Sequence, residues 1–150
     1  MTTIQPVLAD QDSFFVAGIA VRTTSEGGKA RTDIGNLWAT FMSESIQAEI
    51  PTKYSEDVYC VYTDYETDHT GWYTAVLGCR VTEAGHNGMF VALVPSGSNR
   101  VYEPEGQLPD SVGEAWMQIW DESEGRSYVA DYDLYGADGK VEIYVGVEHD

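Results

Sequence analysis

Two aspartates near the C-terminus are placed so that one strand would present both carboxylates on the same side. Side chains alternate along a strand, so Asp131, Asp133 and Tyr135 share one face, while Tyr132 and Leu134 lie on the other. The chain is also rich in rings, with 4 Trp and 10 Tyr among 150 residues. Ring faces beside a carboxylate bind lipophilic cations, but the residues alone favour a solvated face at the edge of the sheet.

A predicted hairpin places a third acid, Glu142, beside the two aspartates. If residues 136–139 form a four-residue loop, Tyr135 pairs with Lys140 and Asp133 pairs with Glu142. Two carboxylates on one face repel each other unless a cation, solvent or a shared proton relieves them. Glu142 is therefore the second candidate acid, and a solvated sheet edge is the alternative for both. A register change of one residue would move Glu142 to the other face.

The remaining candidates are aromatic residues that could line the same cleft. Core packing is the alternative for most helix tryptophans, and the position of Trp72 beside a turn favours a pocket rim or the surface. The aromatic candidates for the ligand site are Trp38, Trp72, Trp116, Tyr62, Tyr65 and Tyr144.

Other kinds of chemistry find little support in the sequence. A GxSxG motif, a phosphate-binding glycine loop and a plausible Cys/His pair are all absent. His69, His86 and His149 lack metal-ligand spacing, so we predict neither a metal nor a cofactor. Cys60 and Cys79 lie in apolar runs and are expected to be buried, reduced thiols of a cytoplasmic protein.

Charge narrows the possible partners. Lys and Arg number 8 against 25 Asp and Glu, a net charge of −17. This balance argues against direct binding of nucleic acid and against anionic membranes. It leaves solubility or a salty habitat, attraction of cationic ligands, or docking onto a basic protein partner. We expect no targeting segment and no bilayer-spanning stretch.

Apolar periodicity predicts two helices separated by strands. The first contains Ile34 to Ile46, with Asp33 as its N-cap and Pro51 after its end. The second contains Val112 to Trp120, with Asp110 or Ser111 as the cap and Gly125 following. The predicted strands are Phe14–Thr23, Val58–Asp64, Tyr73–Val81, Met89–Val94, Asn99–Tyr102, Tyr128–Tyr135 and Val141–Val147.

The order of elements indicates an internal duplication. A strand, a helix and two strands are followed by much the same series, and Ile34 to Trp38 matches Val112 to Trp116. We therefore predict one α+β domain over residues 1–150, made of half-repeats at about 12–85 and 86–150. Each half would place a helix on a small antiparallel sheet, with a pseudo-two-fold axis and a central cleft between the halves.

The ordered motifs resemble the GyrI-like family, the effector-binding domain of AraC- and MerR-type regulators, which also occurs alone as gyrase-inhibitor-like and integron-cassette proteins. The matching stretches are Val16–Arg22, Ile34–Trp38, Val58–Tyr65, Val76–Val81, Glu114–Trp120, Ala130–Tyr135 and Val141–Val147. The resemblance implies the duplicated fold and a central pocket for hydrophobic cations, without room for a DNA-binding helix-turn-helix.

The resemblance also assigns the pocket acid. In the family this acid ends an Asp-aromatic-Glu string, which here reads Asp131-Tyr132-Asp133, so the position maps to Asp133 with a side chain one methylene shorter. The leading function is binding of small cationic amphipaths, as a sensor or sequestering protein without enzymatic activity. The family leaves two alternatives open: an acidic module that docks onto an enzyme such as gyrase, and a hydrolase that uses the same acid.

Overall fold

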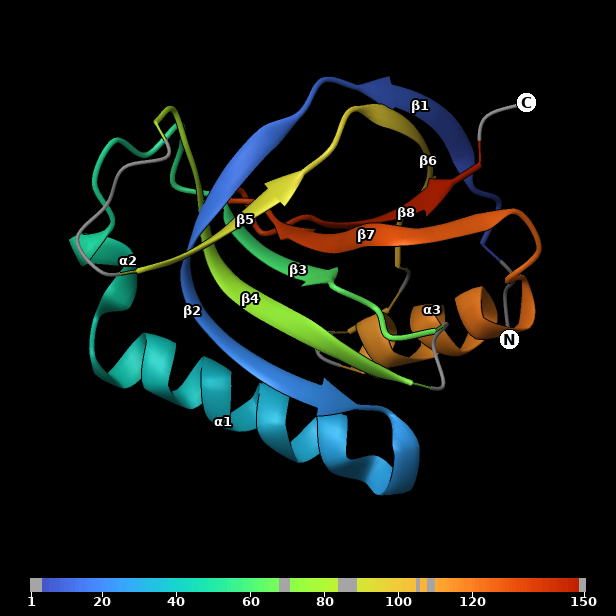
Figure 1. The fold of residues 1–150 in the computed structure, drawn as a ribbon, viewed down its shortest axis with the longest axis horizontal. Coiled ribbons are helices and arrows are strands. Elements are labelled where there is room, and N and C mark those ends of the chain that lie inside the picture. The colour runs from blue at the N-terminus through green and yellow to red at the C-terminus, as the bar shows by residue number, and fades with distance from the viewer. Residues whose placement is uncertain (1–3, 68–70, 84–88, 105, 108–109, 149–150) are drawn as a thin grey trace.

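Within the described residues, eight strands form one curved sheet (Figure 1). The computed structural model describes residues 4–67, 71–83, 89–104, 106–107 and 110–148. The elements are β1 (Val7–Gln11), β2 (Phe14–Thr24), a 3-10 turn η1 (Glu26–Gly28), α1 (Lys29–Ser43), α2 (Ile46–Glu49), β3 (Val58–Thr63), β4 (Trp72–Val81), β5 (Phe90–Val94), β6 (Gly97–Tyr102), α3 (Asp110–Asp121), β7 (Arg126–Tyr135) and β8 (Val141–Val147). The predicted α+β class is confirmed, and the seven predicted strands are found within two residues at each end.

The sheet is continuous across the molecule. Its strand order is β1-β6-β8-β7-β3-β4-β2-β5, and every neighbouring pair is antiparallel. The small antiparallel sheets expected of the two halves are joined into one, because β3 and β7 pair directly along six residues of β3. Asp131 and Asp133, the acidic residues of β7, lie on this central pair of strands.

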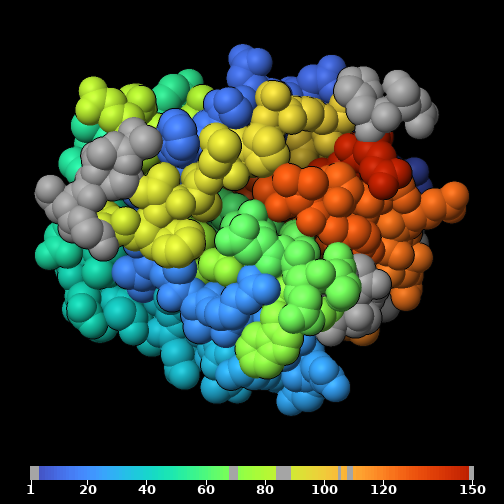
Figure 2. All heavy atoms as spheres, in the orientation of Figure 1, coloured from blue at the N-terminus to red at the C-terminus, as the bar shows by residue number. Residues whose placement is uncertain are grey.

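The strand order is symmetric in a way that suits a duplication. It reads the same from either edge when β1 to β4 are exchanged with β5 to β8. The outer strands are exchanged, since β1 pairs with β6 and β5 pairs with β2. Figure 2 shows the yellow β5–β6 segment packed between the blue N-terminal strands and the orange β7. The half-repeat boundaries at 12–85 and 86–150 stay a prediction.

The edge strand β1 was not expected from the sequence. Its apolar residues Val7 and Leu8 are 66% and 72% exposed. An edge strand of five residues has no need of the apolar alternation that identifies strands packed on a core. Its pairing with β6 therefore left no periodic signal.

Both long helices pack on the same face of the sheet (Figure 1). Leu37 and Phe41 of α1 pack in a cluster with residues of β2, β3 and β4, while Ala115 and Ile119 of α3 pack against β6 and β8. The opposite face has its own apolar cluster, which includes Phe14 and residues of β5. The sheet thus buries both faces at its centre, and the helix-covered face includes β7.

The first helix begins four residues before the predicted cap. Asp33 lies inside α1, where its carboxylate accepts a 2.8 Å hydrogen bond from the hydroxyl of Thr23 and pairs with Lys29 at 2.9 Å. The N-cap prediction for Asp33 is therefore wrong. The turn before α1 carries two left-handed glycines, Gly27 and Gly28, with φ of 65° and 76°.

The β7–β8 hairpin has a longer loop than predicted. The amide of Gly136 donates to the carbonyl of Lys140 at 2.8 Å, which places Lys140 inside the loop. Tyr135 therefore pairs with Val141, and Glu142 lies opposite Leu134 instead of Asp133. The predicted pairing of Asp133 with Glu142 is wrong by one residue, and that shift puts Glu142 on the other face of the sheet.

The two cysteines are buried free thiols, as predicted. Burial raises the pKa of Cys79 to about 11 and raises the pKa of Cys60 further. The described helices are all too short or too polar to cross a membrane. The three histidines lie outside the described residues, so the predicted absence of a metal site stays a prediction.

Candidate functional site

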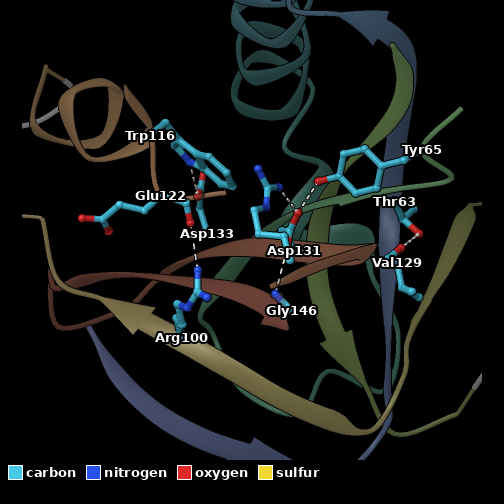
Figure 3. Close-up of polar contacts among 10 residues, drawn as sticks. Thr63, Tyr65, Arg100, Trp116, Glu122, Val129, Asp131, Asp133 and Gly146 are labelled. Atoms are coloured by element: carbon cyan, nitrogen blue, oxygen red, sulfur yellow. Dashed lines mark hydrogen bonds and ion pairs between the residues drawn. The ribbon is translucent and has the colours of Figure 1, made fainter. Parts of the chain in front are cut away.

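Asp133 lies at the centre of the sheet and is 1% exposed. Its Oδ2 accepts hydrogen bonds from the hydroxyls of Tyr62 at 2.7 Å and Tyr135 at 3.3 Å. Its Oδ1 accepts one from the indole Nε1 of Trp116 at 2.8 Å (Figure 3). Because β3, β7 and α3 each supply a donor, the fold holds the carboxylate in one orientation.

A second buried acid lies two residues earlier on the same strand. Asp131 is fully buried and forms an ion pair with Arg126, with 2.6 Å between Nη2 and Oδ2. Its Oδ2 also accepts a hydrogen bond from the hydroxyl of Tyr65, and its Oδ1 accepts one from the amide of Gly146 at 2.8 Å (Figure 3). Asp131 therefore has a cation within the protein, whereas the direct partners of Asp133 in the described part of the chain are neutral donors.

An irregularity in β7 turns Arg126 toward Asp131. The two residues are an odd number of positions apart, so a regular strand would point their side chains to opposite faces. The pairing register with β8 shifts between Arg126 and Asp131, and Tyr128 has a left-handed φ of 54°. A β-bulge of this kind redirects a side chain. Here it brings the guanidinium to the face that carries both acids.

Aromatic rings surround the acids on the helix-covered face. Tyr62 is edge-on to Trp116, with ring centroids 5.4 Å apart, and lies 5.9 Å from Tyr73. Trp38 of α1 is edge-on to Tyr135 at 4.9 Å. These rings come from α1, α3, β3, β4, β7 and the segment after β3, and ring contacts or hydrogen bonds to Asp133 connect them. We call this set the aromatic cage: Trp38, Tyr62, Tyr65, Tyr73, Trp116, Tyr128 and Tyr135.

Burial changes how Asp133 titrates. Removal from water raises the pKa of Asp133 to about 6, and repulsion from Asp131 adds to this rise. The hydrogen bonds from Tyr62, Trp116 and Tyr135 lower the pKa but only in part offset the effect of burial. An unpaired buried carboxylate costs free energy, so the site favours anything that supplies a positive charge.

This raised pKa predicts a pH-dependent stability. In the folded protein the group holds its proton up to about pH 6, against 3.8 for its ordinary value. The cost of ionising Asp133 is therefore absent below pH 3.8 and complete above pH 6, where it reaches about 3 kcal/mol. We expect the free energy of unfolding of the wild type, relative to Asp133→Asn, to fall by about 1 to 2 kcal/mol between pH 5 and pH 8. Urea denaturation of both proteins measures this difference.

The comparison with Asp133→Asn cancels the contribution of acids that do not interact with position 133. A difference that stays constant across this pH range would contradict the raised pKa. Repulsion from Glu142 does not contribute to this difference, because Glu142 lies on the other face of the sheet. The difference therefore reports mainly the burial of Asp133.

The structure separates the predicted site residues into two groups. Tyr62, Trp116 and Asp133 are in direct contact, and Tyr65 and Trp38 belong to the same cage. The other three lie elsewhere: Trp72, Glu142 and Tyr144.

Trp72 begins β4 and is 40% exposed, with the amino group of Lys29 5.9 Å from its ring centroid. Tyr144 stacks on Tyr132 on the opposite face of the sheet and donates a 3.2 Å hydrogen bond to Glu142. Glu142 lines an open depression of about 730 Å³ beside the β7–β8 loop. Asp133 does not line that depression, so the two acids do not share it.

Sequence reasoning missed several members of the cage. Tyr135 was not among the candidates, although it shares the strand parity of Asp133 and that signal would have identified it. Tyr73 and Tyr128 lie at the ends of predicted strands, where parity gives no fixed direction. Arg126 preceded the predicted strand, and the bulge that turns it inward has no recognisable motif.

Comparisons with known proteins were made on sequence and on structure. Residues 8–147 match the profile of a family described as Cass2, integron-associated effector binding protein. A search of curated protein sequences finds no match. Among solved structures, an integron cassette protein from the mobile metagenome of Vibrio cholerae, VCH_CASS2, superposes with a TM-score of 0.76 at 26% identity, covering 97% of both chains.

Two further structures share the fold at lower identity. SAV2435, solved with tetraphenylphosphonium bound, gives a TM-score of 0.80 at 17% identity over 96% of this chain and 94% of its own. EcmrR, solved in a complex with DNA, gives a TM-score of 0.60 at 16% identity over 98% of this chain and 58% of its own. These likenesses show a fold that is found both alone and as part of a longer DNA-binding protein.

Proposed function

Because this chain belongs to the family of integron-associated effector binding proteins, we propose that it binds small lipophilic cations in the aromatic cage, with Asp133 as the counter-ion. The observation that carries the proposal is the state of Asp133, a buried carboxylate whose partners among the described residues are three neutral donors and no cation. A ligand cation would supply the missing charge, and the ring faces would supply the apolar and cation–π contacts.

Two further observations support this function. SAV2435, which shares the fold, was solved with tetraphenylphosphonium, a lipophilic cation. The net charge of −17 also attracts cations to the surface and repels anions. The role that we infer from this binding is that of a sensor or sequestering protein.

Binding requires the cage to open. Asp133 is 1% exposed, and the rings of Tyr62 and Trp116 are in contact with each other beside it. A ligand that reaches the carboxylate has to displace at least one of these rings and replace the hydrogen bond that the ring makes. The side chains of Trp116 and Trp38 come from separate helices, so small movements of α1 and α3 would widen the cage.

Removing the charge of Asp133 tests the proposal. We expect Asp133→Asn to weaken tetraphenylphosphonium binding by about 10- to 100-fold, the effect of losing one charge-assisted contact of about 1–3 kcal/mol. The uncharged ligand triphenylphosphine oxide should change its affinity little, because the shape of the cage is kept. Isothermal titration calorimetry at pH 7.5 measures both affinities.

Asp12→Asn is the matched control. Asp12 is exposed between β1 and β2, so its replacement changes the net charge equally without touching the cage. Equal losses for the charged and the neutral ligand, or no loss for either, would show that Asp133 is not the counter-ion. A loss in the Asp12→Asn control of the same size would assign the effect to the overall charge.

A further inference from the structure

Arg126 has hydrogen-bond donors that find no acceptor among the described residues. Its side chain is 1% exposed, and its Nη2 pairs with Asp131 at 2.6 Å. Its Nε and Nη1 are buried and have no hydrogen-bond partner within the part of the chain that the structure describes. A buried donor without an acceptor costs folding free energy. Some acceptor from outside the chain would therefore stabilise this arginine.

These donors border the cage that holds Asp133. The guanidinium carbon lies 4.4 Å from the ring centroid of Tyr128 and 5.8 Å from that of Trp116. The same Trp116 donates its indole N–H to Asp133. One indole ring therefore lies next to both a carboxylate whose described partners are all neutral and a guanidinium with two unused donors. A molecule lying along this ring would reach the two groups together.

The charges decide what kind of acceptor fits. Arg126 and Asp131 neutralise each other, so the pair attracts a further anion only weakly. A ligand carboxylate would also lie near Asp131 and Asp133, and both would repel it. An uncharged oxygen gains the hydrogen bonds of the guanidinium without this repulsion.

We propose that Arg126 forms a second subsite, which binds an uncharged carbonyl-type oxygen of the same ligand whose cation is held by Asp133. This inference rests on the proposed function and restricts the class of ligand that the site prefers. The preferred ligands are lipophilic monocations that carry a carbonyl or similar acceptor, and purely hydrocarbon cations use only half of the site.

A pair of ligands that differ in one group tests this subsite. The probes are (4-benzoylbenzyl)trimethylammonium, a diaryl ketone, and (4-benzylbenzyl)trimethylammonium, in which a methylene replaces the carbonyl. We expect the wild type to bind the ketone about tenfold more tightly, the effect of one hydrogen bond to a charged donor. The methylene probe is the more apolar of the two, so the hydrophobic effect alone predicts the reverse order.

The decisive variant is the double substitution Arg126→Met with Asp131→Asn. It removes both members of the buried pair and leaves no unpaired charge. We expect it to bind both probes within about twofold of each other, the advantage of the ketone having been lost with the donors. Arg126→Lys is the second variant, since an ammonium keeps the pair with Asp131 but lacks the Nε and Nη1 positions. Calorimetry gives the affinity ratio for each protein.

The outcomes separate this inference from the proposed function. If the wild type binds both probes equally, or if both variants keep the preference for the ketone, Arg126 is not an acceptor subsite and solvent satisfies its donors. In that case the methylene probe still binds, and still weakens in Asp133→Asn. If neither probe binds, or if Asp133→Asn has no effect on the methylene probe, the proposed function fails and this inference fails with it.

Discussion

Gly18→Ala is expected to unfold the protein or to lower its free energy of unfolding by at least about 3 kcal/mol, a large effect for one methyl group. Gly18 of β2 lies opposite Gly78 of β4. A Cβ built on Gly18 would lie 2.0 Å from the carbonyl oxygen of Leu77, and one on Gly78 would lie 1.9 Å from that of Ala17. The obstacle is backbone in both cases, so no side chain can turn away to make room. Urea denaturation followed by tryptophan fluorescence measures the loss.

The same substitution in a helix is the control. Gly35 lies on the exposed face of α1, with nothing within 4 Å of an added Cβ. Gly35→Ala should raise the free energy of unfolding by about 1 kcal/mol, because alanine is the better helix former. If Gly18→Ala were tolerated as well as Gly35→Ala, the close approach of β2 and β4 would be incorrect.

Arg126→Met alone is expected to lower the free energy of unfolding by about 3–5 kcal/mol, since it leaves the carboxylate of Asp131 buried without its cation. The methionine keeps the apolar contacts with Trp116 and Tyr128 but cannot neutralise the charge. Adding Asp131→Asn should restore most of the loss, because the asparagine oxygen can still accept from Tyr65 or Gly146 and carries no charge.

The double-mutant cycle separates charge from packing. Urea denaturation of the wild type, both single variants and the double variant gives the coupling energy between positions 126 and 131. A double variant as unstable as Arg126→Met would show that the stabilisation came from the shape of arginine. If the free energy of unfolding of Arg126→Met were close to that of the wild type, water or a proton would have replaced the guanidinium as the partner of Asp131.

Much of the framework was predictable because apolar periodicity reports burial. The strands that carry the cage were found from their β-branched and aromatic runs, and parity placed Asp131, Asp133 and Tyr135 on one face. The family resemblance selected Asp133 from the two acids. Tyr62 and Trp116 were named as candidates, and the structure shows them as its hydrogen-bond donors.

The errors came from features that depend on one residue of register or on tertiary contact. One additional residue in the β7–β8 loop moved Glu142 and Tyr144 to the opposite face. A left-handed residue in β7 brought Arg126 inward, and nothing in the order of the side chains reports such a bulge. The exchanged strand β1 pairs with residues about 90 positions later, a distance at which local patterns carry no information.

The exchange of β1 and β5 also affects how the chain folds as it is synthesised. When β1 to β4 have left the ribosome, β1 still lacks β6 and β2 still lacks β5, while β3 has no β7 beside it. Three strands therefore present unpaired backbone groups until the second half of the chain arrives. Long-range pairing of this kind folds slowly, and the nascent first half is the stage at which chaperones have most to protect.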